Sequence, residues 1–483
     1  MKSIYIQTLT SEKIAVLTEN QTVKHIAFDR VKKSSKVGNI YVGRVVRVDT
    51  GLQAAFIDIG EKKLAFLLKK EIPASRKDKR IPIENLIYEG MSIVVQVIKD
   101  AYSSKGASVT ANITIPGQYS IYLPFGNYVA FSKQLSNQVK DKLQGTFQQW
   151  KMGEEGVIFR TASKKADREE LKKEWEFLRS SWKQLYKDSQ KIKRPSLIFE
   201  EQDIPNRFLR KFATLDVEKI VFDESEVAQQ AKSIFPHLAE KMKWEGAFQQ
   251  NLPFSIEALI DSITSKRVKI SSGVELIMEK TEALTVIDVN TASYVGKLDK
   301  ESTVYHTNVM AVKEIAKQIQ LRNIAGIIVI DFINMKDEKH KKQLLEELEK
   351  HLKEDPVYTK IYGFTNLGMV EMTRKREGLD SYSLFCKDNE HILSDEALAY
   401  RLERELLNYR KKDAEAFLLE LPSTLLQYVL TSLNLEKLQK TLKIPVFYEQ
   451  KALENHPYVV KFIGDVHWLE HLRDNGHTID KLF

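Results

Sequence analysis

Two apolar stretches each run into an aspartate: Thr285-Val286-Ile287-Asp288-Val289-Asn290 and Gly326-Ile327-Ile328-Val329-Ile330-Asp331-Phe332. Short continuous apolar runs of this kind are typical of buried strands. Between them, residues 304–321 carry apolar side chains at helical spacing. Strand, helix and strand in this order form a βαβ unit, which places the two strands parallel in one sheet. The sequence therefore predicts an α/β domain in which Asp288 and Asp331 lie near the carboxyl ends of neighbouring strands.

This pair of aspartates is a candidate metal site. Two carboxylates held close together repel each other unless a cation or a proton lies between them. Open α/β sheets bind their ligands at the carboxyl ends of the strands. Mg2+ prefers carboxylate oxygens and keeps several waters for a phosphate substrate. The pair, with Asn290 beside Asp288, therefore predicts metal-assisted phosphoryl chemistry. The alternative is an aspartate that only caps a helix or ends a strand, which is the better explanation of a single residue of this kind.

The composition restricts the class of protein. The chain has 483 residues, which predicts two to four domains. Lys and Arg total 74 against 66 Asp and Glu, a net charge of +8 that favours a polyanionic partner. The single cysteine, Cys386, excludes an internal disulfide and any zinc site that needs two thiolates from one chain. Residues 1–10 lack a secretory leader, and no apolar run reaches ~18 residues. A cytoplasmic protein without a membrane span is therefore expected.

The rest of the chain divides into blocks with different patterns. Residues 1–35 alternate and predict a strand pair, whereas several short strands with glycine turns beyond Gly38 predict a small barrel. Residues 69–80 are charged and predict a surface loop. Residues 167–192 predict a long helix whose heptad-like seam of Leu and Trp packs against a neighbouring element.

Several motifs, in the same order along the chain, resemble the ribonuclease E/G family. The motifs are G-N-I-Y-V-G-R-V (38–45), L-Q-A-A-F-I-D-I-G (52–60), G-V-I-F-R-T-A (156–162), T-E-A-L-T-V-I-D-V-N (281–290), G-I-I-V-I-D-F-I-N-M (326–335) and G-M-V-E-M-T-R-K-R (368–376). The resemblance covers roughly residues 36–380. It implies an α/β multidomain fold: an RNase H-like scaffold with an inserted S1-type β-barrel, a 5' sensor, a DNase I-like catalytic domain and a small C-terminal domain.

The resemblance also implies roles for particular residues. Asp288 and Asp331 would bind the catalytic Mg2+, and Asn290 would support the attacking water or the phosphate. A 5'-monophosphate sensor would be formed by Gly117, Ile121, Arg160 and Thr161. A guanidinium fork and a hydroxyl suit phosphate oxygens, which is the chemistry that this role needs.

Three further residues would bind single-stranded RNA. The resemblance places Phe56 and Phe66 on the RNA face of the barrel, where aromatic rings stack on bases. Lys105 would contact the phosphate backbone. Without the resemblance, Phe56 would be interpreted as a core residue, because it alternates with neighbours in a strand.

The sequence departs from the family pattern at several positions. The family often has a Cys-x-x-Cys motif that shares one zinc between two chains, whereas Cys386 has no second cysteine near it. We therefore expect no zinc and no zinc-linked tetramer, and a homodimer stays open. Lys133 and Asn366 stand at positions where the family has arginines, which predicts a weaker dependence on the 5'-phosphate. Asn334 replaces an aspartate beside the second catalytic strand.

Taken together, the residues and the resemblance predict a Mg2+-dependent endoribonuclease that cuts single-stranded RNA and leaves 5'-phosphate ends, in rRNA or tRNA maturation or mRNA decay. The alternatives are a non-catalytic RNA-binding protein and a phosphoesterase acting on DNA or small phosphates. The expected domains, in chain order, are the first RNase H-like segment (1–35), the barrel (36–118), the sensor (119–205), the second RNase H-like segment (206–265), the catalytic domain (266–383), a linker (384–395) and the C-terminal domain (396–483).

Overall fold

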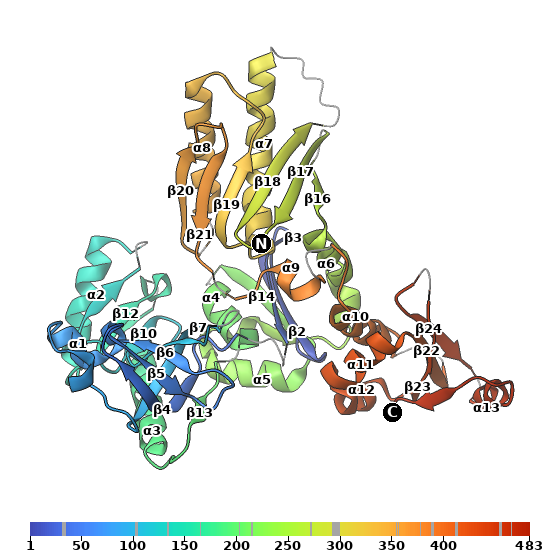
Figure 1. The fold of residues 1–483 in the computed structure, drawn as a ribbon, viewed down its shortest axis with the longest axis horizontal. Helices are drawn as coiled ribbons and strands as arrows, with labels where there is room; N and C mark the ends of the chain where they lie inside the picture. Colours follow the sequence, from blue (N-terminus) through green and yellow to red (C-terminus); the bar gives the residue numbers. More distant parts are fainter. Residues whose placement is uncertain are drawn as a thin grey trace. The chain divides into compact units, whose positions relative to one another are not determined.

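The computed structural model describes the chain in two compact units (Figure 1). The barrel unit comprises residues 34–218 and 229–241, and the aspartate unit comprises residues 1–33, 219–228 and 242–483. The description covers all residues except 31–34, 102–104, 133–134, 165, 202, 214–215, 271–272, 292–299, 354, 356, 377, 388–390, 411–413, 454–455 and 465. Within the described ranges, no helix has both the length and the apolar character needed to cross a bilayer.

The barrel unit contains a closed β-barrel. Its strands pair in the cyclic order β4-β5-β6-β8-β7, and β7 pairs back onto β4 to close the ring. Alternate side chains such as Val45, Ile57 and Val95 fill the interior. The predicted barrel is confirmed. The strands are β4 (Ile40–Asp49), β5 (Ala54–Asp58), β6 (Ala65–Leu68), β7 (Ser92–Lys99) and β8 (Ser108–Thr110), with β13 (Ser196–Phe199) paired to β4.

The loop predicted for residues 69–80 is wrong over about two thirds of its length. A 3-10 turn, η1 (Lys69–Glu71), leads into the short helix α1 (Pro73–Lys77). Pro73 favours a helix start, because its fixed φ suits the first helical position. Ile72, between the two, is buried in the barrel core and so anchors this charged segment.

A second sheet in the barrel unit has the order β11-β12-β10-β9. The long helix α3 packs against it through Trp175, Leu178 and Trp182, which confirms the predicted helix and its packing seam. A capping box between Asp167 and Glu170 starts α3. The elements are β9 (Ile115–Pro116), β10 (Ser120–Leu123), β11 (Val129–Phe131), α2 (Asn137–Trp150), β12 (Gly156–Phe159), α3 (Arg168–Ser189) and α4 (Phe208–Phe212).

In the aspartate unit, the N-terminal strands β1–β3 share one sheet with β14 and β15, which lie about 200 residues later in the chain. The strand order is β15-β14-β1-β2-β3. The predicted strand pair near the N-terminus is incomplete, because a third strand, β3, pairs with β2. The residues of β3, T-V-K-H-I-A-F-D-R, do not alternate strictly between apolar and polar types, so the strand lacks the usual sequence signal. The elements are β1 (Lys2–Gln7), β2 (Glu12–Glu19), β3 (Thr22–Arg30), β14 (Val217–Phe222), α5 (Ser225–Ile234), β15 (Met242–Trp244) and α6 (Ile256–Thr264).

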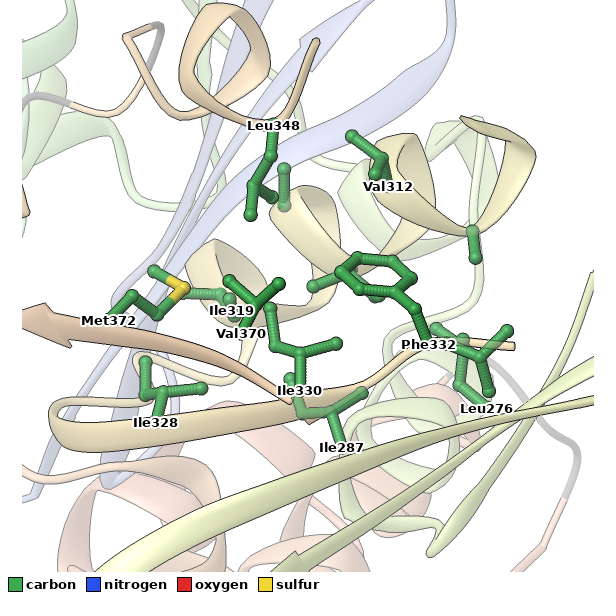
Figure 2. Packing of buried hydrophobic residues seen from close by; sticks show 14 of the residues in the cluster. Leu276, Ile287, Val312, Ile319, Ile328, Ile330, Phe332, Leu348, Val370 and Met372 are labelled. Atoms are coloured by element: carbon green, nitrogen blue, oxygen red, sulfur yellow. The ribbon is translucent and has the colours of Figure 1, made fainter. Parts of the chain in front are cut away.

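The sheet that bears the two aspartates has the order β16-β17-β18-β19-β21-β20. Helices α7 and α8 cover one face, and Figure 2 shows Val312, Ile319 and Leu348 packed with Ile287 and Ile330 of the strands. The predicted βαβ unit is confirmed as β18, α7 and a parallel β19. The elements are β16 (Arg267–Lys269), β17 (Val274–Lys280), β18 (Leu284–Thr291), α7 (Lys300–Leu321), β19 (Gly326–Asp331), α8 (Glu338–Leu352), β20 (Thr359–Phe364) and β21 (Val370–Arg374).

The C-terminal region of this unit has a separate sheet of order β24-β22-β23-β25. Its central strand β22 is buried along its whole length and packs on α10 and α11. The elements are α9 (Ser381–Phe385), α10 (Asp395–Asn408), β22 (Ala416–Leu421), α11 (Ser423–Ser432), α12 (Leu435–Leu442), β23 (Val446–Gln450), β24 (Val459–Ile463), α13 (His467–Asp474) and β25 (Ile479–Lys481).

Candidate functional site

The two aspartates lie directly opposite each other. In the parallel ladder between β18 and β19, Asp288 is the Cα partner of Asp331. Neighbouring strands are about 4.8 Å apart, so the two carboxylates lie within reach of one cation. The structure therefore brings together the two residues that the sequence predicted as a pair.

Both side chains project from the face of the sheet that α7 and α8 leave uncovered. Ile287, Val289 and Ile330 are buried under these helices, so the alternate residues face the other way. Asp331 is exposed and Asp288 is half-buried. The Asn290 amide nitrogen donates to Asp288 Oδ2 at 2.7 Å, which holds this carboxylate in place.

A residue that sequence reasoning missed stabilises the end of β19. Asn308 of α7 is fully buried; its side-chain nitrogen donates to the Ile333 carbonyl at 2.8 Å, and its oxygen accepts from the Ile333 amide at 3.1 Å. This clamp positions the backbone two residues beyond Asp331. A signal was present, because Asn308 lies one helical turn before the buried Val312 and so interrupts the apolar face of α7 with an amide.

The donor set fits a hard divalent cation. Where the structure describes the chain, no group of three or more His, Cys, Asp or Glu side chains surrounds a metal position. The pair therefore offers carboxylate oxygens from only two residues. Mg2+ is commonly bound by one or two carboxylates and completes its shell with water and phosphate oxygens. Zn2+ sites instead use three or four protein ligands, commonly nitrogen or sulfur.

In the barrel unit, the residues predicted as a phosphate sensor lie on adjoining segments. Ile121 on β10 pairs with Ile158 of β12, and β12 leads directly into Arg160 and Thr161. The Arg160 amide donates to the Tyr119 carbonyl at 2.8 Å, which ties this segment to the turn after Gly117. The structure therefore places these four predicted residues in one neighbourhood.

The turn after Gly117 is held by Glu174, which the sequence did not single out. The Glu174 carboxylate accepts from the amides of Gln118, Tyr119 and Ser120 at 2.6–3.1 Å, and from the Ser120 hydroxyl at 2.9 Å. Burial raises the pKa of Glu174, and these hydrogen bonds oppose the shift. The carboxylate thus acts as an anchor that orders the backbone of the turn.

The Arg160 guanidinium beside this turn contacts the backbone of a second arginine, Arg210. Arg160 Nη1 donates to the Arg210 carbonyl at 3.4 Å, and among the described residues its buried Nε has no hydrogen-bond acceptor. Burial lowers the pKa of Arg160, and burial together with the charge of Arg160 lowers the pKa of Arg210 to about 10. Arg210 pairs with Glu201. The Thr161 hydroxyl shares a 2.7 Å hydrogen bond with Ser132.

The two predicted aromatic residues form a pair on the outside of the barrel. Phe56 and Phe66 are Cα partners on β5 and β6, and their ring centroids are 5.7 Å apart. Arg47 stacks on Phe56 with its guanidinium 4.4 Å from the ring centroid. Both rings are half-buried, and Phe56 lies outside the core cluster that contains its neighbours Ala55 and Ile57. The interpretation of Phe56 as a core residue is therefore wrong. Lys105 is exposed.

The positions that depart from the family pattern lie in different settings. Lys133 is outside the described residues. Asn366 is exposed in the turn between β20 and β21, and Asn334 is exposed just beyond β19. Cys386 is a free, half-buried thiol, and burial raises its pKa to about 11.

Comparison with known proteins identifies the class of protein. The sequence profile of the ribonuclease E/G family matches residues 114–377. Ribonuclease G of Haemophilus influenzae is 34% identical over 445 residues, covering 87% of this chain and 90% of that protein. Ribonuclease G of Escherichia coli K12 is 30% identical over 86% of this chain and 89% of its own length. Ribonuclease E of a Nostoc species is 34% identical over 72% of this chain and 52% of its own length.

All of these similar proteins are ribonucleases. The chain belongs to the ribonuclease E/G family, as its motifs indicated.

Proposed function

We propose that this protein is a Mg2+-dependent endoribonuclease that cuts single-stranded RNA and leaves a 5'-phosphate and a 3'-hydroxyl. The observation that carries the proposal is the parallel register that sets Asp288 opposite Asp331 on an uncovered sheet face. The names of the similar proteins support RNA as the substrate class. Nearly the whole length of the ribonuclease G relatives is represented in this chain, which favours the same class of reaction.

In this proposal, Asp288 and Asp331 bind the metal ion, and Asn290 keeps the Asp288 carboxylate in the binding orientation through its 2.7 Å hydrogen bond. A bound Mg2+ would activate a water and stabilise negative charge on the scissile phosphate. The Asn308 clamp fixes the backbone beyond Asp331, so the two carboxylates keep their spacing when a charged substrate approaches.

We propose further that the Arg160 neighbourhood binds a 5'-monophosphate. Arg210 is already paired with Glu201, whereas the Arg160 guanidinium has no ion pair among the described residues, and a phosphate would compensate its charge. The free Nε of Arg160 offers a donor for this ligand. Gly117 begins the ordered turn and Ile121 lies just beyond it on β10, so both would supply backbone groups, and the Thr161 hydroxyl would supply another hydrogen-bonding group.

The barrel would bind the RNA strand as well. The exposed sides of Phe56 and Phe66 offer ring surfaces for stacking bases, and Lys105 offers an exposed charge for the backbone. We propose that the barrel is of the S1 type, the β1–β3 sheet with β14 and β15 RNase H-like, and the β16–β21 sheet DNase I-like. The proposed setting is rRNA or tRNA maturation or mRNA decay in the cytoplasm.

The test is cleavage of a short single-stranded RNA with either a 5'-monophosphate or a 5'-hydroxyl, in a Mg2+ titration. We expect Asp288→Asn and Asp331→Asn each to abolish cleavage while RNA affinity without metal is kept. Asp480→Asn on β25, also an exposed aspartate, is the matched control and should cut like the wild type. Binding without cleavage by the wild type would favour a non-catalytic RNA-binding protein. Equal cleavage of DNA would contradict RNA specificity.

A further inference from the structure

Strand pairing extends the row of the aspartate pair to the edge of the sheet. Asp288 on β18 lies opposite Ile277 on β17, and Ile277 lies opposite Arg267 on β16. The same edge strand carries Lys269 two residues further along, in the next row on the same face. In that second row, Lys269 lies opposite Glu275, which lies opposite Asn290.

These basic residues face the same side as the aspartates. Val268, between them on β16, is buried in the core under α7 and α8, as are Leu276 and Met278 on β17. Side chains alternate along a strand, so Arg267 and Lys269 project from the uncovered face. The Arg267 side chain is 61% exposed, and Lys269 is exposed.

We propose that Arg267 and Lys269 bind phosphates of the RNA strand on one side of the cleavage point, so that the strand crosses the sheet from β19 towards β16. The inference rests on the proposed nuclease function and adds a substrate-binding path to it. β16 lies two strand spacings from β18, about 10 Å. Because an arginine side chain can extend from β16 towards β18, the guanidinium can reach the phosphate of a nucleotide next to the one at the aspartates. Between them, Ile277 is half-buried and uncharged, so it does not repel the strand.

The charges of the sheet favour this direction. On the other side of the pair, Val329 of β19 lies opposite Glu371 of β21, which is exposed on the same face. A carboxylate there repels a phosphate, whereas guanidinium and ammonium groups on β16 attract it. The path towards β16 also carries a carboxylate, Glu275, but Arg267 already pairs with it. On the other side, β20 offers one exposed cation on this face, Lys360 opposite Thr373 of β21. The two exposed cations of β16 outnumber it, which favours the path towards β16.

A competing explanation is an ordinary surface ion pair. Arg267 Nη1 lies 2.7 Å from Glu275 Oε2. The Arg267 side chain is 61% exposed but that of Glu275 only 16%, so solvent screens the pair in part and its contribution to stability is on the order of 1 kcal/mol. On RNA binding, a phosphate would replace or share the Glu275 contact. The two explanations differ in one respect: only the phosphate contact makes RNA affinity depend on Arg267.

The experiment measures the affinity of the full-length protein for a single-stranded RNA oligonucleotide in EDTA, across a series of salt concentrations. We expect Arg267→Ala and Lys269→Ala each to weaken binding about tenfold at low salt. Each should also reduce the slope of log affinity against log salt by about 0.7, the value for one phosphate contact on a single strand. Glu275→Gln removes a competing carboxylate and should tighten binding.

Lys350→Ala is the matched control. Lys350 lies on α8, which covers the opposite face, with 70% of its side chain exposed and an ion pair to Glu347 at 3.1 Å. The Lys350→Ala substitution removes one positive charge of similar exposure. It should leave the slope of log affinity against log salt unchanged. Equal effects of Arg267→Ala and Lys350→Ala, or no effect of either, would overturn the proposal. If the wild type cuts RNA normally in that case, the nuclease function stands without this path; a wild type that neither binds nor cuts contradicts both.

Discussion

Gly117→Ala tests how tightly the proposed sensor turn is packed. A Cβ added at this position would lie 2.6 Å from Cδ and Oε1 of Glu174, and 2.8 Å from Cδ1 of Leu178. At these distances the new Cβ would overlap the neighbouring atoms, so Glu174, Leu178 or the backbone of the turn must shift. Leu178 is buried, and the Glu174 carboxylate is held by hydrogen bonds from three backbone amides and the Ser120 hydroxyl. Retreat of either side chain therefore costs packing or hydrogen bonds.

The expected loss of stability follows from this geometry. Inserting a methyl group into a closely packed region usually costs about 1–3 kcal/mol. The matched control is Gly145→Ala in the interior of α2, where an added Cβ meets nothing within 4 Å. Alanine is the better helix former by roughly 0.5–1 kcal/mol, so this variant should gain stability. Glycine-to-alanine substitution is thus expected to lower the free energy of unfolding at position 117 and to raise it at position 145.

The assay is urea unfolding followed by tryptophan fluorescence, which Trp175 and Trp182 make sensitive to the core beside Leu178. Cleavage of 5'-monophosphate RNA relative to 5'-hydroxyl RNA gives the functional readout. We expect Gly117→Ala to lower both the unfolding midpoint and this ratio, because the displaced turn no longer orders the backbone near Arg160. A Gly117→Ala variant as stable as the wild type, beside a stabilised Gly145→Ala, would show that Glu174 moves freely and that the reasoning is wrong.

Two other predictions concern the barrel and a buried carboxyl. Phe66→Ala should weaken single-stranded RNA binding by about 1–3 kcal/mol, the usual contribution of one stacked base, whereas Phe177→Ala on the exposed side of α3 should not; equal losses in a binding titration would contradict stacking. Burial raises the pKa of Glu403 to about 7, so the folded state favours its protonated form. That contribution to stability is fully present below the unfolded pKa and is lost as the pH rises through about 7. Glu403→Gln should therefore raise the melting temperature by more at pH 8 than at pH 5. The matching gain in the free energy of unfolding is at most about 3 kcal/mol. A rise in melting temperature that is the same at both pH values would contradict the burial argument.

Several features of the site could be predicted because they are written in local patterns. The apolar runs before Asp288 and Asp331, and the helical spacing between them, specify strand, helix and strand, and chirality and short connections then make the strands parallel neighbours. The glycine-separated strands after Gly38 predicted the barrel in the same way. For these features, the residues that decide the structure are close together in the chain.

Other features arise only from contacts between distant segments. Glu174 anchors a turn more than fifty residues before it, and Asn308 clamps a strand end twenty-five residues after it. Nothing in the periodicity of a helix shows which amide or carboxylate will meet an unpaired backbone group elsewhere. The three-residue strand β16 is too short to have a recognisable period, so its alignment with the aspartate row was not predictable.

The sequence by itself determined the classes of element, the adjacency of the two aspartate-bearing strands and the pairing of two carboxylates with an amide. The tertiary structure decided the register that sets Asp288 opposite Asp331, the face on which they lie, and the placement of Arg267 in their row. The physical reason is that element type follows from local backbone preference and side-chain periodicity. Register and facing depend on which buried side chains and hydrogen bonds of separate segments fit together.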